Sequence, residues 1–598
     1  MKITNTDRTI PAERYSPLPV GNGSLSLLVD FTGSTLPVPA RSASAAGIWI
    51  AGMRYDKPTF PLIPFGGFTD SRAESSTPLR WRQTLDLDAA AVETECEYPG
   101  SGTVRSRVFV PFGHHAVVIE KECEPAADDG EELEFRFRFA PPRVALTPTG
   151  VDSFRCRIDS EQALWQEECC RCFAIGGGAE FRQPEPGVIV GRMTGNRAVF
   201  VIAFDRESAE FFHDRSFAEI RQLHEEDWRK FRARSRIADE LPEALLRPAR
   251  TAEYHLRISA TRWSLPVGIF PTHWQGRYFG FDGFFGVRGL IAAGHAELAA
   301  QAARHYATLL PAARKRAYQY FGGTGDAARY AWEGIESASD EEGSPAGFWR
   351  EHIFHTTHIA LIERDCAEAL GDAEFARDTA YPVIRACAEF FRQHHLYRLA
   401  GNRTVIGKCT DLERLGPARE NAFMTTCGAA ATFRAAAAYA RRFGADAELA
   451  PEWERLADEL LRDLPRDDGK YLVYPGAREP SIALLSGSYP YDVLAPEDPL
   501  QRRAIEFFCA NEKTAGNMYP VGDGVCVWYA GWKALALLRL GEREAAEKML
   551  DAMAAAAGDW SEIFEIRELG NHPWFMTAEG IYLETLLALR GSGRPVVK

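Results

Sequence analysis

The segment AAGHAELAA, residues 292–300, has three counterparts further along the chain. They are ALGDAEFA (369–376), RFGADAELA (442–450) and RLGEREAAE (539–547). Each segment places a glycine directly after an Ala- and Leu-rich run, and the next run begins with Glu in its first turn. Glycine is favoured just after a helix C-terminus, and acidic side chains are favoured at a helix N-terminus. The four segments therefore predict tight turns between paired helices, at Gly294, Gly371, Gly444 and Gly541.

Long polar or aromatic connections alternate with these tight turns from residue 243 onward. They cover 263–283, 321–345, 397–424, 465–498, 512–525 and 558–574. Because short turns alternate with long loops, the long loops should all lie on one face of a stack of helical hairpins. About eleven helices, close to six hairpins, predict an (α/α)6 toroid whose long loops line a central pocket. The alternative is a helical solenoid, but its repeats would be shorter and more regular.

The first 215 residues have a different pattern, made of short β-type runs separated by Gly, Pro, Asp and Asn. The runs are SLSLLVDF (24–31), GTVRSRVFVPF (102–112), HHAVVIEKE (114–122), LEFRFRFAP (133–141), GVIVGRMTG (187–195) and RAVFVIAF (197–204). Polar and apolar residues alternate in several of them, which is typical of half-buried strands. The sequence thus predicts an antiparallel β-sandwich at 1–215, an amphipathic linker helix within 216–242 and an (α/α)6 domain at 243–598.

The composition excludes several classes of protein. Of the 598 residues, 46% are hydrophobic and 25% are charged, as in ordinary globular domains. The net charge of −14 makes nucleic acid and anionic membranes poor partners. No apolar run reaches the length of about 20 residues that a membrane span needs, and the N-terminus lacks an apolar signal segment. The twelve cysteines are interpreted as reduced thiols. Together with the lack of a signal segment and of a membrane span, they predict a cytoplasmic protein.

The loop that ends at residue 283 is rich in aromatic side chains. The run WQGRYFGFDGFF (274–285) places several rings beside Arg277 and Asp282. Flat rings for stacking, together with charged groups that bind hydroxyls, are what a sugar site needs. The alternative is that the rings belong to the core and that Asp282 caps the next helix. Composition alone leaves both interpretations open.

The next long loop carries Trp332 and Glu333, and the helix after it begins FWREHIFHTTH (348–358). Glu351, His352, His355 and His358 partly share one helix face. His355 and His358 are three positions apart, whereas a zinc helix would place them four apart. We therefore expect these side chains to form a polar lining of the toroid mouth, and we expect neither a metal nor an organic cofactor.

Two further loops are acidic. One contains Asp411, Glu413 and Glu420, and the other, GDWSEIFEIRELGNHPWF (558–575), contains Asp559, Glu562, Glu565 and Glu568. Carboxylates on separate loops of one rim can act as general acid and general base across a pocket. The alternative is that acidic loops are simply common in a protein of this charge. The cluster Cys169, Cys170 and Cys172 lies in the β region and is interpreted as free thiols.

With these residues in view, the chain resembles glycoside hydrolase family 65 and its clan relatives, the glucoamylases of family 15. The order of parts is similar, including a linker helix like LHEEDWRKFRARSRI (223–237). The aromatic–Asp segment of those families resembles RYFGFDGFF (277–285), and their Trp–Glu pair resembles YAWEG (330–334). The helix that follows in family 65 is similar to REHIFHTTHIALIERDCAEALGDAEF (350–375). The resemblance covers most of residues 216–595.

The resemblance also implies roles for individual residues. GKCTDLERLGPARENAFMTT (407–426) matches the acid-bearing loop and implies that Glu413 is the general acid, although the Gly-Pro and Tyr of the family motif are absent. The acidic loop before residue 575 implies that Glu562 is the general base, with Glu565 in reserve. The residues expected to bind substrate are Arg277, Tyr278, Phe279, Asp282, Trp332, Glu333, Glu351, Asp411, Trp528, Lys533 and Glu565.

The function predicted from these matches is an inverting, exo-acting glycoside hydrolase that releases a hexose, with glucose favoured, from α-linked oligosaccharides or glycosides. An inverting disaccharide phosphorylase is the nearest alternative, but the Ser-Ser cluster that holds phosphate in family 65 is not found. A polysaccharide lyase using His395 and Tyr397, or a carbohydrate-binding protein without catalysis, are further alternatives. The sugar, the linkage and the oligomeric state stay open, with a homodimer as one option.

Overall fold

The computed structural model describes residues 1–7, 15, 17–35, 47–50, 62–124, 132–139, 144–158, 168–268, 277–334, 351–411, 418–511, 519–521, 524–557, 563–565 and 574–590. The chain forms two compact units. The first contains Met1–Ser235 and Tyr254–Arg277, and the second contains Arg236–Glu253 and Tyr278–Lys598. The domain boundaries expected from the sequence, at 215 and 242, stay a prediction.

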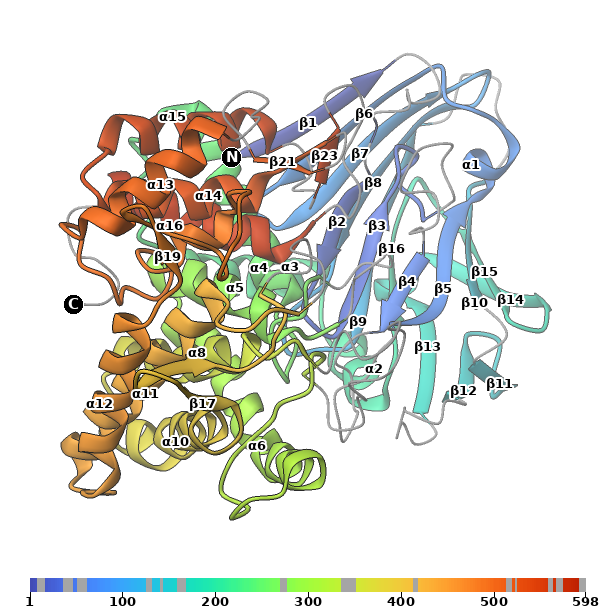
Figure 1. Cartoon of the computed structure of the whole chain (residues 1–598). Coiled ribbons are helices and arrows are strands. Elements are labelled where there is room, and N and C mark those ends of the chain that lie inside the picture. Colours follow the sequence, from blue (N-terminus) through green and yellow to red (C-terminus); the bar gives the residue numbers. More distant parts are fainter. Residues whose placement is uncertain are drawn as a thin grey trace. The chain divides into compact units, whose positions relative to one another are not determined.

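Two antiparallel sheets make up most of the first unit (Figure 1). The larger sheet has nine strands in the order β1 (Lys2–Asp7), β6 (Arg80–Asp86), β7 (Ala91–Tyr98), β8 (Gly102–Phe109), β9 (Ala116–Glu124), β16 (Arg197–Ala203), β13 (Glu168–Ala174), β12 (Ser153–Ile158) and β11 (Val144–Pro148). The smaller sheet has seven strands in the order β14 (Ala179–Glu185), β15 (Val188–Met193), β10 (Glu134–Phe139), β5 (Ile63–Asp70), β4 (Gly47–Ile50), β3 (Leu25–Val29) and β2 (Leu18–Gly21).

Aromatic side chains join the two sheets into a sandwich. In β10 the phenylalanines of the EFRFRF run are buried, whereas its charged residues are at least partly exposed. Phe135 of β10 stacks on Phe200 of β16, with ring centroids 4.2 Å apart. Phe139 of β10 also packs edge-on against Phe154 of β12, at 4.7 Å. Contacts between the inner faces of two sheets define a β-sandwich, so the predicted fold of this region is confirmed.

The other face of the nine-stranded sheet is covered in part by two helices, α2 (Arg206–His213) and α3 (Phe217–Arg232). Val118, Val199 and Val201 of the sheet form a buried cluster with Phe212 and Ile220 of these helices. Helix α3 begins with a capping box, in which Ser216 and Glu219 bond to each other's backbone N–H. The linker region of the sequence therefore forms a helix, as predicted.

In the second unit, six elements form a closed inner ring in which each contacts the next. They are α5 (Gly280–Ala293), α8 (His355–Leu370), α11 (Phe423–Phe443), the short 3-10 turn η6 (Ile482–Leu485), α14 (Val527–Arg539) and α16 (Met576–Arg590), which contacts α5 again. Every residue of α5 is buried. Its apolar residues occur on all sides, as in helices that lie inside a protein, and its two charged residues, Asp282 and Arg288, have buried partners.

Six further helices make up the outer layer of the toroid (Figure 1). They are α4 (Glu243–Ser259), α6 (Ala296–Phe321), α10 (Tyr381–Phe390), α12 (Leu449–Arg462), α13 (Pro499–Asn511) and α15 (Arg543–Ala556). The hydroxyl of Tyr582 in α16 donates to the carbonyl of Leu245 in α4, at 3.1 Å. This bond joins the last inner helix to the first outer one, and the (α/α)6 arrangement predicted from the sequence is confirmed.

The four glycine turns have the predicted backbone conformation. Gly294, Gly371, Gly444 and Gly541 have φ of 97°, 67°, 63° and 84°. At such positive φ values a side chain would be strained, so glycine allows each helix to stop and the chain to reverse. No helix among the described residues is both long enough and apolar enough to span a bilayer.

Candidate functional site

The first turns of the inner helices meet at one end of the ring. Thr577, at the start of α16, donates its hydroxyl to Asp282 in the first turn of α5, with an O–O distance of 2.7 Å. The ring of Phe281 lies 5.4 Å from that of Trp528 in α14 and 5.3 Å from that of Phe354, just before α8. Each of these helices follows a long connection. The long loops therefore attach to the same end of the toroid, as the sequence predicted.

The segment that carries Trp332 and Glu333 is fastened to the start of α5. Phe279 and Glu333 form an antiparallel bridge, and the Gly334 N–H donates to the carbonyl of Tyr278. The Trp332 ring lies 5.6 Å from that of Phe279. Trp332 is 9% exposed and Glu333 is half-buried. These contacts bring together four of the predicted substrate residues, two from each of two segments that are separated in the sequence.

Three histidines lie beneath these aromatic residues. The ring of His352 meets Trp332 edge-on at 4.1 Å, and His352, His355 and His358 are fully buried. Burial lowers the pKa of His358 to about 3 and those of the other two well below their usual value. They are therefore neutral and packed below the rings, whereas a polar lining of the mouth was expected. No group of three metal-binding side chains occurs in the described part of the chain.

Asp411 is held at the N-terminus of α11. Its carboxylate accepts hydrogen bonds from the backbone N–H groups of Met424 and Thr425, at 2.9 and 2.7 Å, and from the Thr425 hydroxyl, at 2.7 Å. Burial nevertheless raises the pKa of Asp411 to about 6, because removal from water outweighs these three bonds. The preceding residue, Thr410, bridges to His352 and bonds to the carbonyl of Glu351. Asp411 thus anchors its loop beside the start of α8.

The remaining predicted residues lie at several places or outside the described residues, and Trp528, beside Phe281, is at the same end of the ring. Trp528 is buried and stacks on Tyr529 at 3.9 Å. Lys533 lies near Cys509 of α13, and burial lowers the pKa of its ammonium group. Arg277 is half-buried and belongs to the first unit. Glu565 is part of strand β23 (Ile563–Glu565), while Glu413 and Glu562, the predicted acid and base, lie outside the described residues.

Comparisons with known proteins identify the fold. No family model and no curated protein sequence matches the chain. Among solved structures, a protein from the human microbiome assigned as a kojibiose phosphorylase is similar over 98% of this chain and 88% of its own, with a TM-score of 0.67 and 9% identity. A bacterial glucoamylase complexed with acarbose is similar over 98% of this chain and 97% of its own, with a TM-score of 0.58 and 10% identity. The chain has the six-hairpin glycosidase fold.

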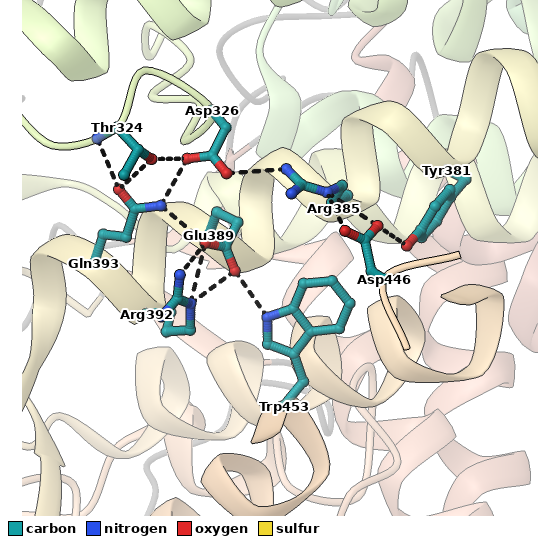
Figure 2. A network of polar contacts seen from close by, with 9 residues as sticks. All are labelled: Thr324, Asp326, Tyr381, Arg385, Glu389, Arg392, Gln393, Asp446 and Trp453. Carbon is teal, nitrogen blue, oxygen red and sulfur yellow. Dashed lines mark hydrogen bonds and ion pairs between the residues drawn. The ribbon is translucent and has the colours of Figure 1, made fainter. Parts of the chain in front are cut away.

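In this six-hairpin toroid, a polar network fixes the loop that leads to Trp332 (Figure 2). Asp326 accepts from Arg385 of α10 at 3.1 Å and from Gln393 at 2.7 Å. Two residues further on, the Ala328 N–H donates to the carbonyl of Ala386, also in α10, at 2.9 Å. The outer helix α10 thus holds the start of a segment whose end reaches the mouth of the toroid.

Sequence reasoning missed the residues that connect the loops of the six-hairpin toroid to one another. Thr577 is the clearest case, since it bonds to Asp282 across 295 residues of sequence. The available signal was its place in the first turn of the last helix, directly after a long loop. Arg385 and Asp326 gave no signal at all, because isolated charges on helices and loops are usually solvated.

Proposed function

We propose that this protein is an inverting, exo-acting glycoside hydrolase that releases a hexose from α-linked oligosaccharides or glycosides. One observation carries the proposal: the mouth of a six-hairpin toroid brings Phe279 and Asp282 of one segment together with Trp332 and Glu333 of another. The two solved structures compared above are named as a kojibiose phosphorylase and a glucoamylase, which are enzymes of carbohydrate chemistry. We infer the reaction class from these two facts together.

The chemistry of the mouth suits the non-reducing end of a saccharide. Phe279 and Trp332 offer flat rings on which the C–H face of a sugar can stack. Asp282 and Glu333 offer carboxylate oxygens to which sugar hydroxyls can donate. The three histidines below the rings are neutral, but Arg329 is buried beside His355, at 3.0 Å, and brings a positive charge near the two carboxylates.

In the proposed mechanism Glu413 protonates the glycosidic oxygen, and Glu562 deprotonates a water that attacks the anomeric carbon from the opposite face. Glu413 is two positions from Asp411, which is anchored beside α8. Glu562 belongs to the loop that leads to α16, where Thr577 binds Asp282. Both loops therefore attach to the same end of the ring. We expect the two carboxyl groups to be separated by about 6.5–9.5 Å, which leaves room for the water.

The test is to incubate the protein with a panel of α-linked disaccharides in phosphate-free buffer and to follow the products by NMR. We expect free hexose with inverted anomeric configuration and no sugar 1-phosphate, and we expect added phosphate to change nothing. Glu413→Gln should lower kcat by about 10²–10⁴ on natural disaccharides and by less on substrates with good leaving groups. Glu420→Gln, which changes an exposed carboxylate in the same segment, is the matched control.

An inverting phosphorylase is the second candidate, favoured by the TM-score of 0.67 to the protein assigned as a kojibiose phosphorylase. Against it, the loop with Glu562 carries four carboxylates and one arginine. At about 4 Å and an effective dielectric near 20, each uncompensated like-charge contact costs on the order of 4 kcal/mol, which disfavours phosphate. Strict dependence on phosphate, or normal activity of Glu562→Ala, would replace the hydrolase proposal by the phosphorylase.

The polysaccharide lyase alternative receives no support. His395 is buried, and burial lowers its pKa to about 3, whereas Tyr397 is 53% exposed. A lyase needs its acid and base to face the same sugar. A buried imidazole and a solvent-facing phenol do not fit that requirement.

A further inference from the structure

We infer that the nine-stranded sheet carries a second carbohydrate site, which binds a neutral oligosaccharide and is separate from the mouth of the toroid. A cavity of about 560 Å³ lies on this sheet, within the usual size range of ligand pockets. Its lining comes from β1, β6, β7, β8, β9, β16 and α3, so it belongs entirely to the first unit. The inference does not depend on the proposed hydrolase activity.

All side chains that line the cavity are polar. Six are cationic, four are carboxylates and one is the hydroxyl of Thr84, whereas the side chains of Thr94 and Ser106 point to the opposite face of the sheet. An amphipathic helix or a lipid chain needs an apolar surface and would find none here. The same sheet face is apolar where α2 and α3 cover it, at Val118, Val199 and Val201. The change from valines to charged residues along the strands thus coincides with the place where the cavity opens.

The strand register arranges these charges in rows. Arg82, Glu95, Arg105, Glu122 and Arg197 are direct partners across five adjacent strands. A second row contains Thr84, Glu93, Arg107 and Glu120. At about 4.8 Å between strands, the first row extends for roughly 19 Å, the length of a short oligosaccharide. Hydrogen-bond donors and acceptors therefore alternate at regular intervals along the cavity.

Ion pairs within the wall neutralise most of this charge. The Nε of Arg105 lies 2.7 Å from a carboxylate oxygen of Glu95, Arg107 pairs with Glu93, and Arg197 pairs with Glu120. The two cations in excess, Lys2 and Arg221, pair with Asp86 and Glu225 beside the lining, so an ionic ligand would have to compete with existing ion pairs. A sugar hydroxyl both donates and accepts, so it can bond to a carboxylate and a guanidinium without breaking their pair. A neutral, polyhydroxylated ligand is the class that fits.

The test is electrophoresis of the full-length protein in native gels that contain soluble starch, hydroxyethyl cellulose or xylan. We expect at least one of these neutral polysaccharides to slow the wild type, with little dependence on salt. Arg105→Ala combined with Arg107→Ala should weaken the retention, by about fivefold for each hydrogen bond lost. Arg80→Ala is the matched control, because Arg80 pairs with Glu97 on the same face, at 3.3 Å, outside the cavity lining.

Further variants keep the test decisive. If the double variant does not fold, Arg82→Ala replaces it, since Arg82 is exposed and its removal should again reduce retention. Glu413→Gln should be retained like the wild type, which separates this site from the proposed catalytic one. The inference is overturned if the wild type and the double variant migrate alike with all three polysaccharides. Retention by polygalacturonate alone, abolished by salt, would overturn the neutral ligand class.

Discussion

Two clusters of buried charge in the toroid are built in opposite ways. In the first, Arg288 of α5 bonds to Glu584 of α16 at 2.8 Å and to Asp365 of α8 at 2.9 Å, and the Tyr489 hydroxyl donates to Glu584 at 2.7 Å. In the second, Asp411 accepts only backbone N–H and hydroxyl donors among the described residues. The first cluster contains its own counter-charge, and the second does not.

The difference shows in the protonation of each cluster. Burial alone would lower the pKa of the Arg288 guanidinium, but Glu584 and Asp365 raise this pKa well above its usual value, so Arg288 stays charged. Burial without a cation raises the pKa of Asp411 to about 6, close to neutrality. Carboxyl groups that change protonation near neutral pH are typical of functional sites. We therefore interpret the Arg288 cluster as one that stabilises the ring, and Asp411 as part of the candidate site at the mouth of the toroid.

The largest effect should come from Arg288→Met. It would leave Glu584 buried without a cation and Asp365 with Arg364 as its remaining partner, and this should lower the free energy of unfolding by about 3–5 kcal/mol. Arg364→Met is the control, because Arg364 also pairs with Asp365 but is partly exposed, and its removal should cost about 1 kcal/mol or less. Urea unfolding measures both values. Equal, small losses would show that the Arg288 cluster does not stabilise the ring.

Asp411→Asn should change how stability depends on pH. Because the folded pKa of about 6 exceeds the unfolded value of about 3.9, the folded state holds the extra proton, and wild-type stability should fall as pH rises through this window. Relative to the variant, the loss should reach about 3 kcal/mol above about pH 6. Urea midpoints at several pH values test this. Parallel curves for the two proteins would contradict the assignment of Asp411 to the uncompensated cluster.

Asp282→Asn should affect turnover far more than stability. The amide keeps the shape and can still accept from Thr577, but it no longer offers a charged acceptor to a sugar hydroxyl. We expect kcat/KM to fall about 100-fold, equivalent to about 2.7 kcal/mol. Asp458→Asn, at a surface position that is 75% exposed, should leave kcat/KM unchanged. A normal kcat/KM for Asp282→Asn would remove this residue from the proposed site.

The smallest effect should come from Thr577→Val, which removes the hydroxyl that orients Asp282. We expect a loss of about 1 kcal/mol in stability and a several-fold fall in kcat/KM. Thr585→Val in the same helix is the matched control, because among the described residues its hydroxyl bonds only to the carbonyl of Ile581, at 2.7 Å. It should match Thr577→Val in stability and the wild type in kinetics. If both variants have wild-type kinetics, Thr577 does not position Asp282.

The sequence by itself determined the architecture of both units. The alternation in EFRFRF predicted a half-buried strand, and glycines such as Gly294 predicted helix turns with positive φ, because both features depend on a few neighbouring residues. Tertiary structure alone decided which side chains meet and which are charged. Asp282 meets Thr577, and Arg288 meets Glu584, across 295 and 296 residues. The three histidines were expected from the sequence to form a polar lining, yet they are buried and neutral. The pKa of a side chain depends on its contact with water, and distant segments of the chain decide that contact.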